Sequence, residues 1–320
     1  MELPPLLREG VDRILEGIPV GDIRNAAERL SGRYRGEVRD GRFHLSDNLA
    51  ASAYLATRLP ATYAAIRASL SAVAEIRQGW EPQTLLDIGS GPGSVFWATC
   101  DQWPSIARAT MVEGCDPIRR VGEQLAQRAG SRQIAWIAAD IQRGLPTLES
   151  ADLVTLSYVL GELAPDAIAR LTERLWQMSR DVLLVVEPGT PAGWRRILLV
   201  RDRLIALGAH IVAPCTHAER CPLAAPDWCH FSRRVARSRL HRLAKDGDVP
   251  WEDEKFIYLA ATRLPVETPE ARVLAPPRSA SGIVRLKLCC SNGQLEERVV
   301  TKRQGDAFKV ARRLDWGDRL

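Results

Sequence analysis

The amino-acid sequence predicts an α/β fold built on a doubly wound parallel sheet, and two observations support this prediction. From Glu81 onward, short apolar runs typical of β-strands alternate with amphipathic stretches typical of helices. Such alternation produces parallel strands with helices packed on both faces of the sheet. A turn with three alternating glycines, GSGPG, directly follows the first apolar run, where folds of this kind bring their backbone close to a ligand.

The individual elements follow from the same patterns. Residues 1–78 carry Ala and Leu at helical spacing, interrupted by Pro60, and are expected to form helices. Residues 282–302 are expected to form a β-hairpin that turns at Asn292–Gly293. The other expected strands are residues 84–89, 108–114, 134–140, 152–160, 182–189 and 255–263, and the other expected helices are residues 116–130, 164–180 and 193–209.

Composition excludes some classes of protein. The chain has 320 residues, of which 46% are hydrophobic and 26% are charged, as in ordinary globular proteins. No apolar run approaches the ~20 residues of a membrane span, and the N-terminus lacks the continuous apolar stretch of a signal peptide. We therefore expect a cytoplasmic protein that makes no membrane contact, with a monomer as the default state. We divide it into a helical N-terminal region (1–78), an α/β core (79–213), a segment rich in Cys and Arg (214–250), a strand that returns to the core (251–264) and a C-terminal β-hairpin region (265–320).

Acidic residues accompany the glycine turn at positions that suit a nucleoside. Glu113 ends the second strand, where an acid can bind both ribose hydroxyls, and Asp140 ends the third, where an acid can bind an adenine amino group. This order resembles the class I S-adenosylmethionine-dependent methyltransferases, with an NAD-binding site as the alternative. The pattern G-x-G-x-G, rather than G-x-G-x-x-G, favours S-adenosylmethionine. The expected cofactor-binding residues are Asp87, Gly89, Gly91, Gly93, Glu113 and Asp140.

The sequence assigns no catalytic residue. Amino-group methyltransferases of this class often carry an (Asn/Asp)-Pro-Pro-aromatic motif after the fourth strand, whereas this chain has SYVLGEL. Ser157, Tyr158 and Glu162 are expected to line a pocket there. Glu162 can serve as a base, although an acid at a helix start is more often a partner of the helix dipole. Glu187, after the fifth strand, is expected in the pocket wall.

Three of the seven cysteines, Cys215, Cys221 and Cys229, fall within fifteen residues. Their wide spacing differs from the short C-x₂₋₄-C pair of zinc sites and favours an iron–sulfur cluster, with zinc as the alternative. A fourth thiolate would come from Cys289 or Cys290 in the C-terminal hairpin. Cys289 is favoured because it shares a strand face with basic residues, whereas Cys290 shares the apolar face.

Two histidines, His217 and His230, flank the three cysteines and can replace a thiolate in a zinc site. A run without acids follows at residues 231–245 and is expected to form a helix. A solvated helix normally includes acids for ion pairing, so this composition favours contact with nucleic acid, and with the backbone of a structured RNA in particular. The expected RNA-binding residues are Arg233, Arg234, Arg237, Arg239, Arg242 and Lys245.

Seven segments spread over nearly the whole chain carry a resemblance to a known family, namely LSGRYR, AYLATRLPATYAAIRASL, LLDIGSGPGS, CTHAERCPLAAPDWCHFSRRVAR, DEKFIYLAATR, SGIVRLKLCC and RRLDWGD. They resemble the methyltransferase-like assembly factors of the mitochondrial small ribosomal subunit and their bacterial relatives. The resemblance implies a methyltransferase-like core at 79–213 and a role in small-subunit maturation and translation, with small-subunit rRNA as partner. It also implies a 4Fe–4S cluster on Cys215, Cys221, Cys229 and Cys289.

Two functions remain open at this point. One is an enzyme that methylates small-subunit rRNA with S-adenosylmethionine. The other is a non-catalytic rRNA-binding assembly factor with a structural metal centre. In both, the metal centre is expected to tie residues 214–250 to the C-terminal hairpin and so to hold the basic segment in place.

Overall fold

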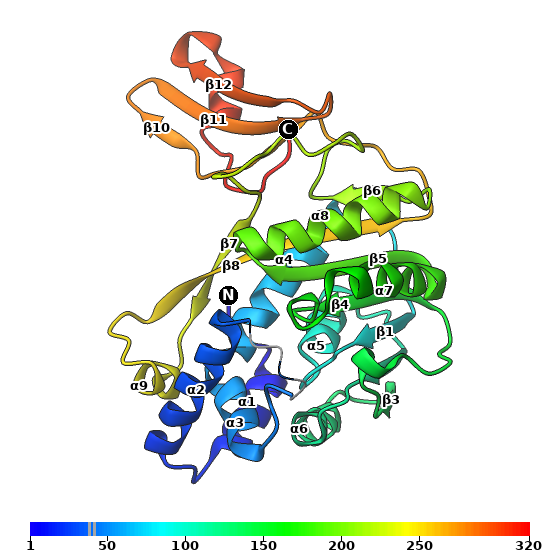
Figure 1. Ribbon diagram of the computed structural model, residues 1–320. Helices are drawn as coiled ribbons and strands as arrows, with labels where there is room; N and C mark the ends of the chain where they lie inside the picture. Colours follow the sequence, from blue (N-terminus) through cyan, green and yellow to red (C-terminus); the bar gives the residue numbers. More distant parts are fainter. Residues whose placement is uncertain (38–39, 41–42) are drawn as a thin grey trace.

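The computed structural model describes residues 1–37, 40 and 43–320. Its centre is an eight-stranded sheet in the order β3-β2-β1-β4-β5-β8-β6, with β7 also paired to β8 (Figure 1). The strands are β1 (Thr84–Ile88), β2 (Arg108–Val112), β3 (Gln133–Ile137), β4 (Ala151–Ser157), β5 (Ser179–Pro188), β6 (His210–Ala213), β7 (Phe231–Ala236) and β8 (Trp251–Thr262).

The sheet is mixed rather than wholly parallel. Strands β1 to β5 pair in parallel, as predicted, whereas β8 runs antiparallel to β5, β6 and β7. Residues 237–250, which include α9 (Arg239–Ala244), join β7 to β8 as an antiparallel pair. The central strands β4 and β5 are buried almost throughout, which explains their nearly continuous apolar sequence.

Helices cover both faces of the central sheet. Helices α4 and α5 lie on one face, and α7 and α8 on the other (Figure 1). The predicted break near Pro60 separates α3 from α4, where Pro60 occupies the first turn, a position that tolerates its missing N–H. The α-helices are α1 (Pro5–Leu15), α2 (Val20–Arg35), α3 (Asn48–Thr57), α4 (Leu59–Ile76), α5 (Ser94–Gln102), α6 (Asp116–Ala126), α7 (Pro165–Met178), α8 (Pro191–Ala206), α9 (Arg239–Ala244) and α10 (Asp306–Ala311), with single 3₁₀ turns at Ile141–Arg143, Leu160–Glu162 and Lys302–Gln304.

The prediction of one helix over residues 231–245 is wrong. Residues 231–236 form the edge strand β7, and only Arg239–Ala244 are helical, as α9. Phe231 and Val235 are buried and Arg233 and Arg234 are exposed, and a spacing of four between buried residues fits a helix as well as a strand. Among the described helices, none is both long and apolar enough to span a membrane.

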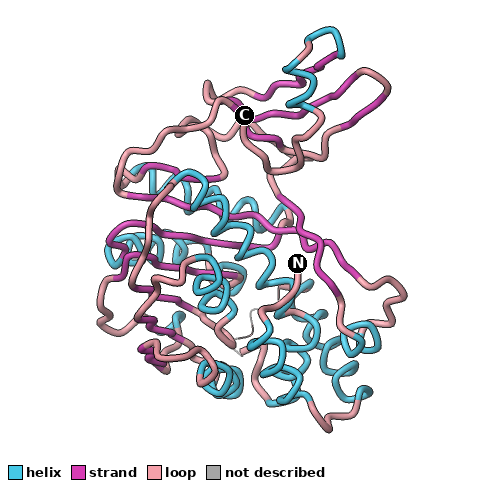
Figure 2. Tube along the Cα trace, turned by 180° about the vertical axis from the view of Figure 1, so that it is seen from behind, coloured by secondary structure: helices cyan, strands magenta, loops and turns pink. Residues whose placement is uncertain are grey.

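The C-terminal residues form a second, smaller antiparallel sheet of β9 (Ala271–Val273), β10 (Arg278–Ala280), β11 (Ile283–Cys290) and β12 (Leu295–Thr301). The predicted hairpin is therefore confirmed, and Gly293 in its turn has a φ of +80°. The sheet and α10 enclose their own apolar core. Both views place this sheet beyond the β6–β8 edge of the central sheet (Figures 1 and 2).

The segment between β6 and β7, which holds three of the cysteines, connects the two sheets. The guanidinium of Arg272, on β9, donates to the carbonyl of Pro214 at 2.8 Å. Lys287, on β11, pairs with Asp227. The hydroxyl of Thr216 donates to the carbonyl of Cys289 at 3.2 Å. These contacts position the C-terminal hairpin directly over the cysteine-rich loop.

Candidate functional site

The glycine turn after β1 adopts a backbone that requires glycine. Gly89, Gly91 and Gly93 have φ values of +68°, +53° and +86°, in the left-handed region where a Cβ is unfavourable. A Cβ on Gly89 would also lie 2.5 Å from Cγ2 of Val159, whereas one on Gly91 would meet nothing within 4 Å. The turn is therefore closely packed below and open above, as a backbone that receives a ligand should be.

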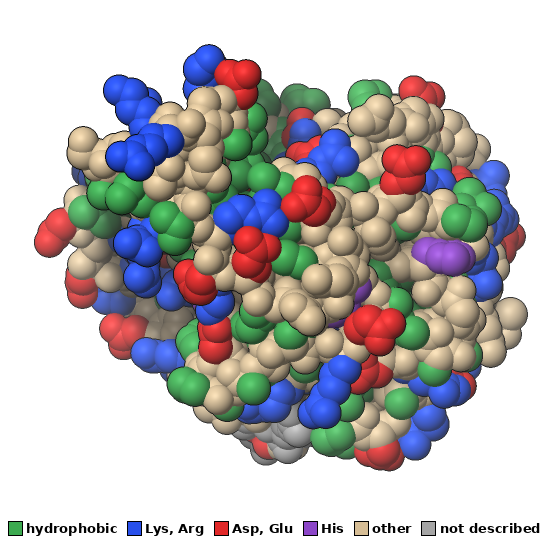
Figure 3. Space-filling model, turned by 90° about the horizontal axis from the view of Figure 1, so that it is seen from above, with side chains coloured by type: hydrophobic (Ala, Val, Ile, Leu, Met, Phe, Trp, Pro, Cys, Tyr) green, Lys and Arg blue, Asp and Glu red, His purple; other side chains and the backbone are tan. Residues whose placement is uncertain are grey.

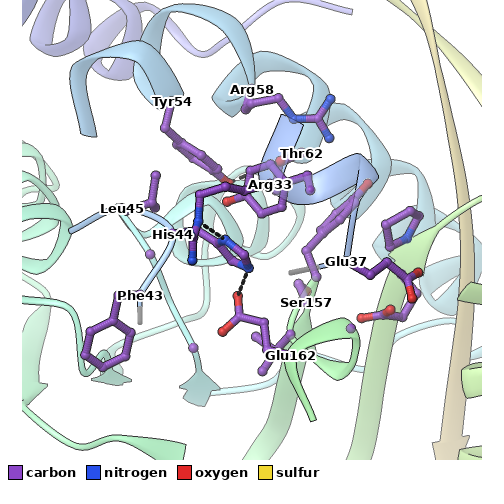
Figure 4. Close-up of a pocket in the computed structure, with 18 of the residues that line it drawn as sticks. Arg33, Glu37, Phe43, His44, Leu45, Tyr54, Arg58, Thr62, Ser157 and Glu162 are labelled. Atoms are coloured by element: carbon purple, nitrogen blue, oxygen red, sulfur yellow. Dashed lines mark hydrogen bonds and ion pairs between the residues drawn. The ribbon is translucent and has the colours of Figure 1, made fainter. Parts of the chain in front are cut away.

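A cavity of about 1000 Å³ opens above this turn, at the carboxyl ends of the central strands. Ligands of open α/β sheets bind at this edge. The N-terminal helical region closes the opposite side of the cavity, so the site lies between two parts of the chain that are distant in sequence (Figure 4). We call it the central cavity, and its lining includes Gly89, Gly91, Glu113, Asp140, Glu162 and Glu187 from the core and Tyr34, His44, Tyr54 and Arg58 from the N-terminal region.

Glu113 supports the glycine turn from the end of β2. Its carboxylate accepts hydrogen bonds from the backbone N–H of Gly91 and of Cys115, each at 2.8 Å. Burial raises the pKa of Glu113, and these backbone donors oppose the rise. Each carboxylate oxygen has a further lone pair, so the side chain can hold the turn and still accept a hydroxyl from a ligand.

The other two predicted acids differ in position. Asp87 lies beneath the turn, fully buried, and accepts a hydrogen bond from the hydroxyl of Thr155 at 2.7 Å. Burial raises the pKa of Asp87 to about 8, despite that hydrogen bond. Asp140 lines the cavity and accepts from the backbone N–H of Gln142 at 2.9 Å, capping a 3₁₀ turn. Asp87 is therefore buried against β4 and does not line the cavity, while Asp140 does.

A row of three polar side chains, Arg33, His44 and Glu162, crosses the cavity, and no sequence pattern indicates that these residues meet. The guanidinium of Arg33 donates to Nδ1 of His44 at 3.0 Å, which leaves the imidazole proton on Nε2, 3.8 Å from a carboxylate oxygen of Glu162 (Figure 4). Burial and the charge of Arg33 lower the pKa of His44. Burial, followed by the negative charges of Glu113, Glu187 and Asp140, raises the pKa of Glu162 to about 7.

Glu187, predicted in the pocket wall, is held rigidly at the end of β5. One carboxylate oxygen accepts from the backbone N–H of Leu160 at 3.0 Å, and the other accepts from Nε of Arg196 at 2.9 Å. Burial raises the pKa of Glu187 to about 7, although Arg196 opposes the rise. Tyr158 has a φ of +61°, an unfavourable conformation for a residue with a Cβ. Its hydroxyl donates to Glu254 at 3.1 Å, which fixes the ring at the cavity floor.

The four predicted metal ligands lie around one small cavity between the two sheets. Cys215, Cys221, Cys229 and Cys289 all line it, together with His217. Cys289 faces this cavity, as the strand pattern predicted, whereas Cys290 belongs to the apolar core of the C-terminal sheet.

The thiols influence one another across this cavity. Burial, and then the charges of Cys215, Cys221 and Cys289, raise the pKa of Cys229 well above its usual value. Sγ of Cys289 lies 3.4 Å from Nε2 of His217. As placed, no group of three or more His, Cys, Asp or Glu in the described part of the chain could hold a single metal ion. The four cysteines thus share one cavity without forming a single-ion site among the described residues.

The basic segment from β7 to α9 is partly neutralised by β8. Arg234 pairs with Asp253 at 2.9 Å, and both Arg237 and Lys245 pair with Glu252, at 3.1 Å and 3.5 Å. The antiparallel pairing of β7 with β8 thus supplies the acids that residues 231–245 lack. Three expected RNA-binding residues remain, Arg233, Arg239 and Arg242. They form no ion pair with another described side chain.

The strand order, the antiparallel β8 and the glycine turn after β1 together define a class I methyltransferase-like protein. The family model described as "Mitochondrial small ribosomal subunit Rsm22" matches residues 48–320. The chain therefore belongs to that family, which agrees with the resemblance seen in the sequence.

Individual relatives extend the comparison. The human mitochondrial ribosome assembly protein METTL17 is 28% identical over 93% of this chain, which spans 69% of that protein. A Schizosaccharomyces pombe Rsm22-cox11 tandem protein is 22% identical over 83% of this chain, which spans 42% of the tandem protein.

Two methyltransferases are among the solved structures whose backbone can be superposed on part of this chain. One is a putative RNA methyltransferase from Pyrococcus horikoshii, with a TM-score of 0.41, 11% identity, and coverage of 62% of this chain and 83% of that one. The other is magnesium protoporphyrin IX methyltransferase from Synechocystis with bound SAM, with a TM-score of 0.41, 14% identity, and coverage of 73% and 91%.

Proposed function

We propose that this protein assists assembly of the small ribosomal subunit in the cytoplasm, as a monomer that binds small-subunit rRNA. The observation that carries the proposal is the family match over residues 48–320, together with a relative whose name is that of a ribosome assembly protein. The test is co-sedimentation of the protein with small-subunit particles on a density gradient. A protein found only at the top of the gradient, under conditions where subunits are being made, would contradict the proposal.

In this function the segment from β7 to α9 is one contact with RNA. Its unpaired cations, Arg233, Arg239 and Arg242, are placed to neutralise phosphates, and such contacts carry little sequence preference. Changing these three residues to Gln should weaken binding to an rRNA fragment and flatten its dependence on salt. A matched control removes the same charge at three ion-paired and exposed residues, Arg8 on α1, Arg120 on α6 and Arg170 on α7, and should leave binding unchanged.

The central cavity is the proposed site of S-adenosylmethionine. The support is the open glycine backbone beside Glu113 and Asp140, a donor and acceptor set that suits a nucleoside. Isothermal titration with S-adenosylmethionine and with NAD would distinguish the two cofactors. Binding of S-adenosylmethionine alone supports the proposal, and binding of NAD alone would replace it.

The convergent thiols of Cys215, Cys221, Cys229 and Cys289 are the proposed ligands of a 4Fe–4S cluster, with zinc as the alternative. Four thiolates suit such a cluster, and the donor set fits this chemistry because the sulfurs surround a shared space. The centre would be structural, because it would join the loop after β6 to β11. Anaerobic purification followed by iron, sulfide and zinc analysis tests this directly. Iron with sulfide supports the cluster, one zinc moves the site to the zinc class, and neither metal rejects both.

A second candidate function, methylation of rRNA, is favoured by Glu162. Its pKa of about 7 and its place in the central cavity suit a group that accepts a proton from a methylated amine or hydroxyl near neutral pH. His44 would fix the orientation of that carboxylate. The test is transfer of labelled methyl groups to immature small-subunit rRNA. Glu162→Gln should abolish transfer while binding of S-adenosylmethionine persists, and undiminished transfer by this variant would remove Glu162 from the reaction.

A further inference from the structure

Most of the excess positive charge of this protein lies in its C-terminal sheet rather than in the segment that follows the cysteines. Residues 265–320 hold eleven Lys and Arg against seven Asp and Glu, an excess of four in a chain whose net charge is +5. Residues 231–256, which include the basic segment and the acids of β8, hold seven against five. The run of arginines at residues 231–245 is denser along the sequence, but ion pairs with the acids of β8 neutralise part of its charge.

Six of the eleven Lys and Arg of residues 265–320 are exposed and form no ion pair with another described residue. They are Arg278, Arg285, Lys302, Arg303, Arg312 and Arg313. Ion pairs in this sheet engage Arg298, Lys287 and Lys309. Seen from the C-terminal end, blue Lys and Arg side chains gather over one lobe with few acids among them (Figure 3).

Two of these arginines lie directly opposite each other. Arg278 on β10 is the cross-strand partner of Arg285 on β11, and the residue across from Arg285 on β12 is Val299. Like charges at directly opposed positions destabilise a sheet. The fold therefore carries an electrostatic cost on this face that an anionic partner would remove.

The other four cations lie outside strands β10 and β11. Lys302 and Arg303 follow β12, and the backbone N–H of Lys302 donates to Gly282 between β10 and β11 at 2.8 Å. Arg312 and Arg313 end α10, which packs against β11 and β12. Because α10 packs on the face of Val284, Leu286 and Leu288, Arg312 and Arg313 lie on the side of the sheet away from Arg285.

We propose that this face of the C-terminal sheet, centred on Arg278 and Arg285, is a second surface that binds the phosphate backbone of RNA. The proposal rests on the proposed RNA-binding function and adds a contact that residues 231–245 do not supply. Charge complementarity favours a polyanion, and a surface without exposed aromatic rings on β10 or β11 favours a folded RNA recognised by shape over single strands that stack their bases. The hairpin joins the cysteine cavity through Cys289, so the two RNA contacts would be held in a fixed relation to each other.

The test compares the double variant Arg278→Gln/Arg285→Gln with wild type and with a control of equal charge change, Arg8→Gln/Arg170→Gln. Binding to a structured small-subunit rRNA fragment is measured over a range of salt concentrations. The double variant should bind about tenfold more weakly near physiological salt, with a salt slope reduced by about 1.4–1.8, while the control matches wild type. Its thermal midpoint should be unchanged or higher, because a like-charge pair has been removed.

The outcomes separate this inference from the proposed function. If the double variant binds RNA with the affinity and salt slope of wild type, the Arg278 and Arg285 face does not bind RNA. The proposed RNA-binding function would then still stand. Wild-type protein that binds no rRNA would instead refute the proposed function. If the double variant lost binding to vesicles of anionic phospholipid but retained RNA binding, the surface would be a membrane contact and the inference would be wrong.

Discussion

The glycine turn offers a sharp test, because two of its glycines differ in what surrounds them. Replacing Gly89 by Ala places a methyl group 2.5 Å from Val159 in a left-handed backbone. The backbone conformation costs about 1–2 kcal/mol, and the overpacking adds about 1–3 kcal/mol. Gly91→Ala carries only the backbone cost, because nothing lies within 4 Å of the new methyl group. Both variants also stiffen the unfolded chain, which offsets about 0.4–1 kcal/mol in each case and cancels in the comparison.

The free energy of unfolding in urea, followed by tryptophan fluorescence, measures these costs. Gly89→Ala should be less stable than Gly91→Ala by about 1–3 kcal/mol. Gly91→Ala should stay folded yet bind S-adenosylmethionine more weakly, since its methyl group projects into the central cavity. Equal loss of stability in the two variants would refute the reasoning. A Gly91→Ala protein with full affinity would show that the ligand does not approach the turn.

Three further predictions concern the cysteines, the buried acid and the paired basic segment. Cys289→Ser should lose the proposed metal, whereas Cys290→Ser should keep it, as metal analysis of the purified proteins would show; equal metal content in both would contradict the proposed role of Cys289 as a ligand. Burial raises the pKa of Asp87 to about 8 in the folded protein, above its unfolded value of about 4, so the folded protein keeps a proton that the unfolded chain releases. The free energy of unfolding should therefore decrease as the pH rises from about 4 to about 8, by up to about 1.4 kcal/mol per pH unit. Asp87→Asn should remove this part of the pH dependence in urea unfolding while keeping an acceptor for Thr155, and a variant that follows the wild-type pH profile would contradict the buried protonated carboxyl. Burial raises the pKa of Glu252, but a hydrogen bond from His241 and the nearby positive charges outweigh it and lower this pKa to about 2. Glu252→Gln should therefore reduce stability near neutral pH, yet it should raise affinity for RNA because it frees cations of the basic segment. Unchanged affinity, measured by fluorescence anisotropy, would show that the freed cations do not contact RNA.

The sequence alone was sufficient for features that depend on local pattern. Alternating apolar and helical segments predicted β1 to β5 and, between them, α6 and α7, because burial on both faces leaves a continuous apolar signature in a strand. The period of two in β11 predicted that Cys289 and Cys290 face opposite ways, which the two separate apolar clusters confirm. The turn at Gly293 followed from the same local chemistry.

Contacts between distant segments could not be predicted in this way. His44 and Glu162 are 118 positions apart, and no pattern in either neighbourhood indicates that the N-terminal region closes the cavity over the end of β4. The sequence of residues 231–245 indicates unpaired arginines because their acidic partners lie on β8, which only the sheet pairing brings beside them.

The sequence by itself therefore determined the fold class, the family and the residues with the right chemistry, since these depend on residue type and on spacing along the chain. The tertiary structure decided which of those residues meet. It buried Asp87 beneath the turn, brought four thiols to one cavity, and neutralised one basic surface while leaving Arg278 and Arg285 opposed and exposed. The physical reason is that burial and charge pairing depend on distances in space, and these are set by the packing of elements that the chain order separates.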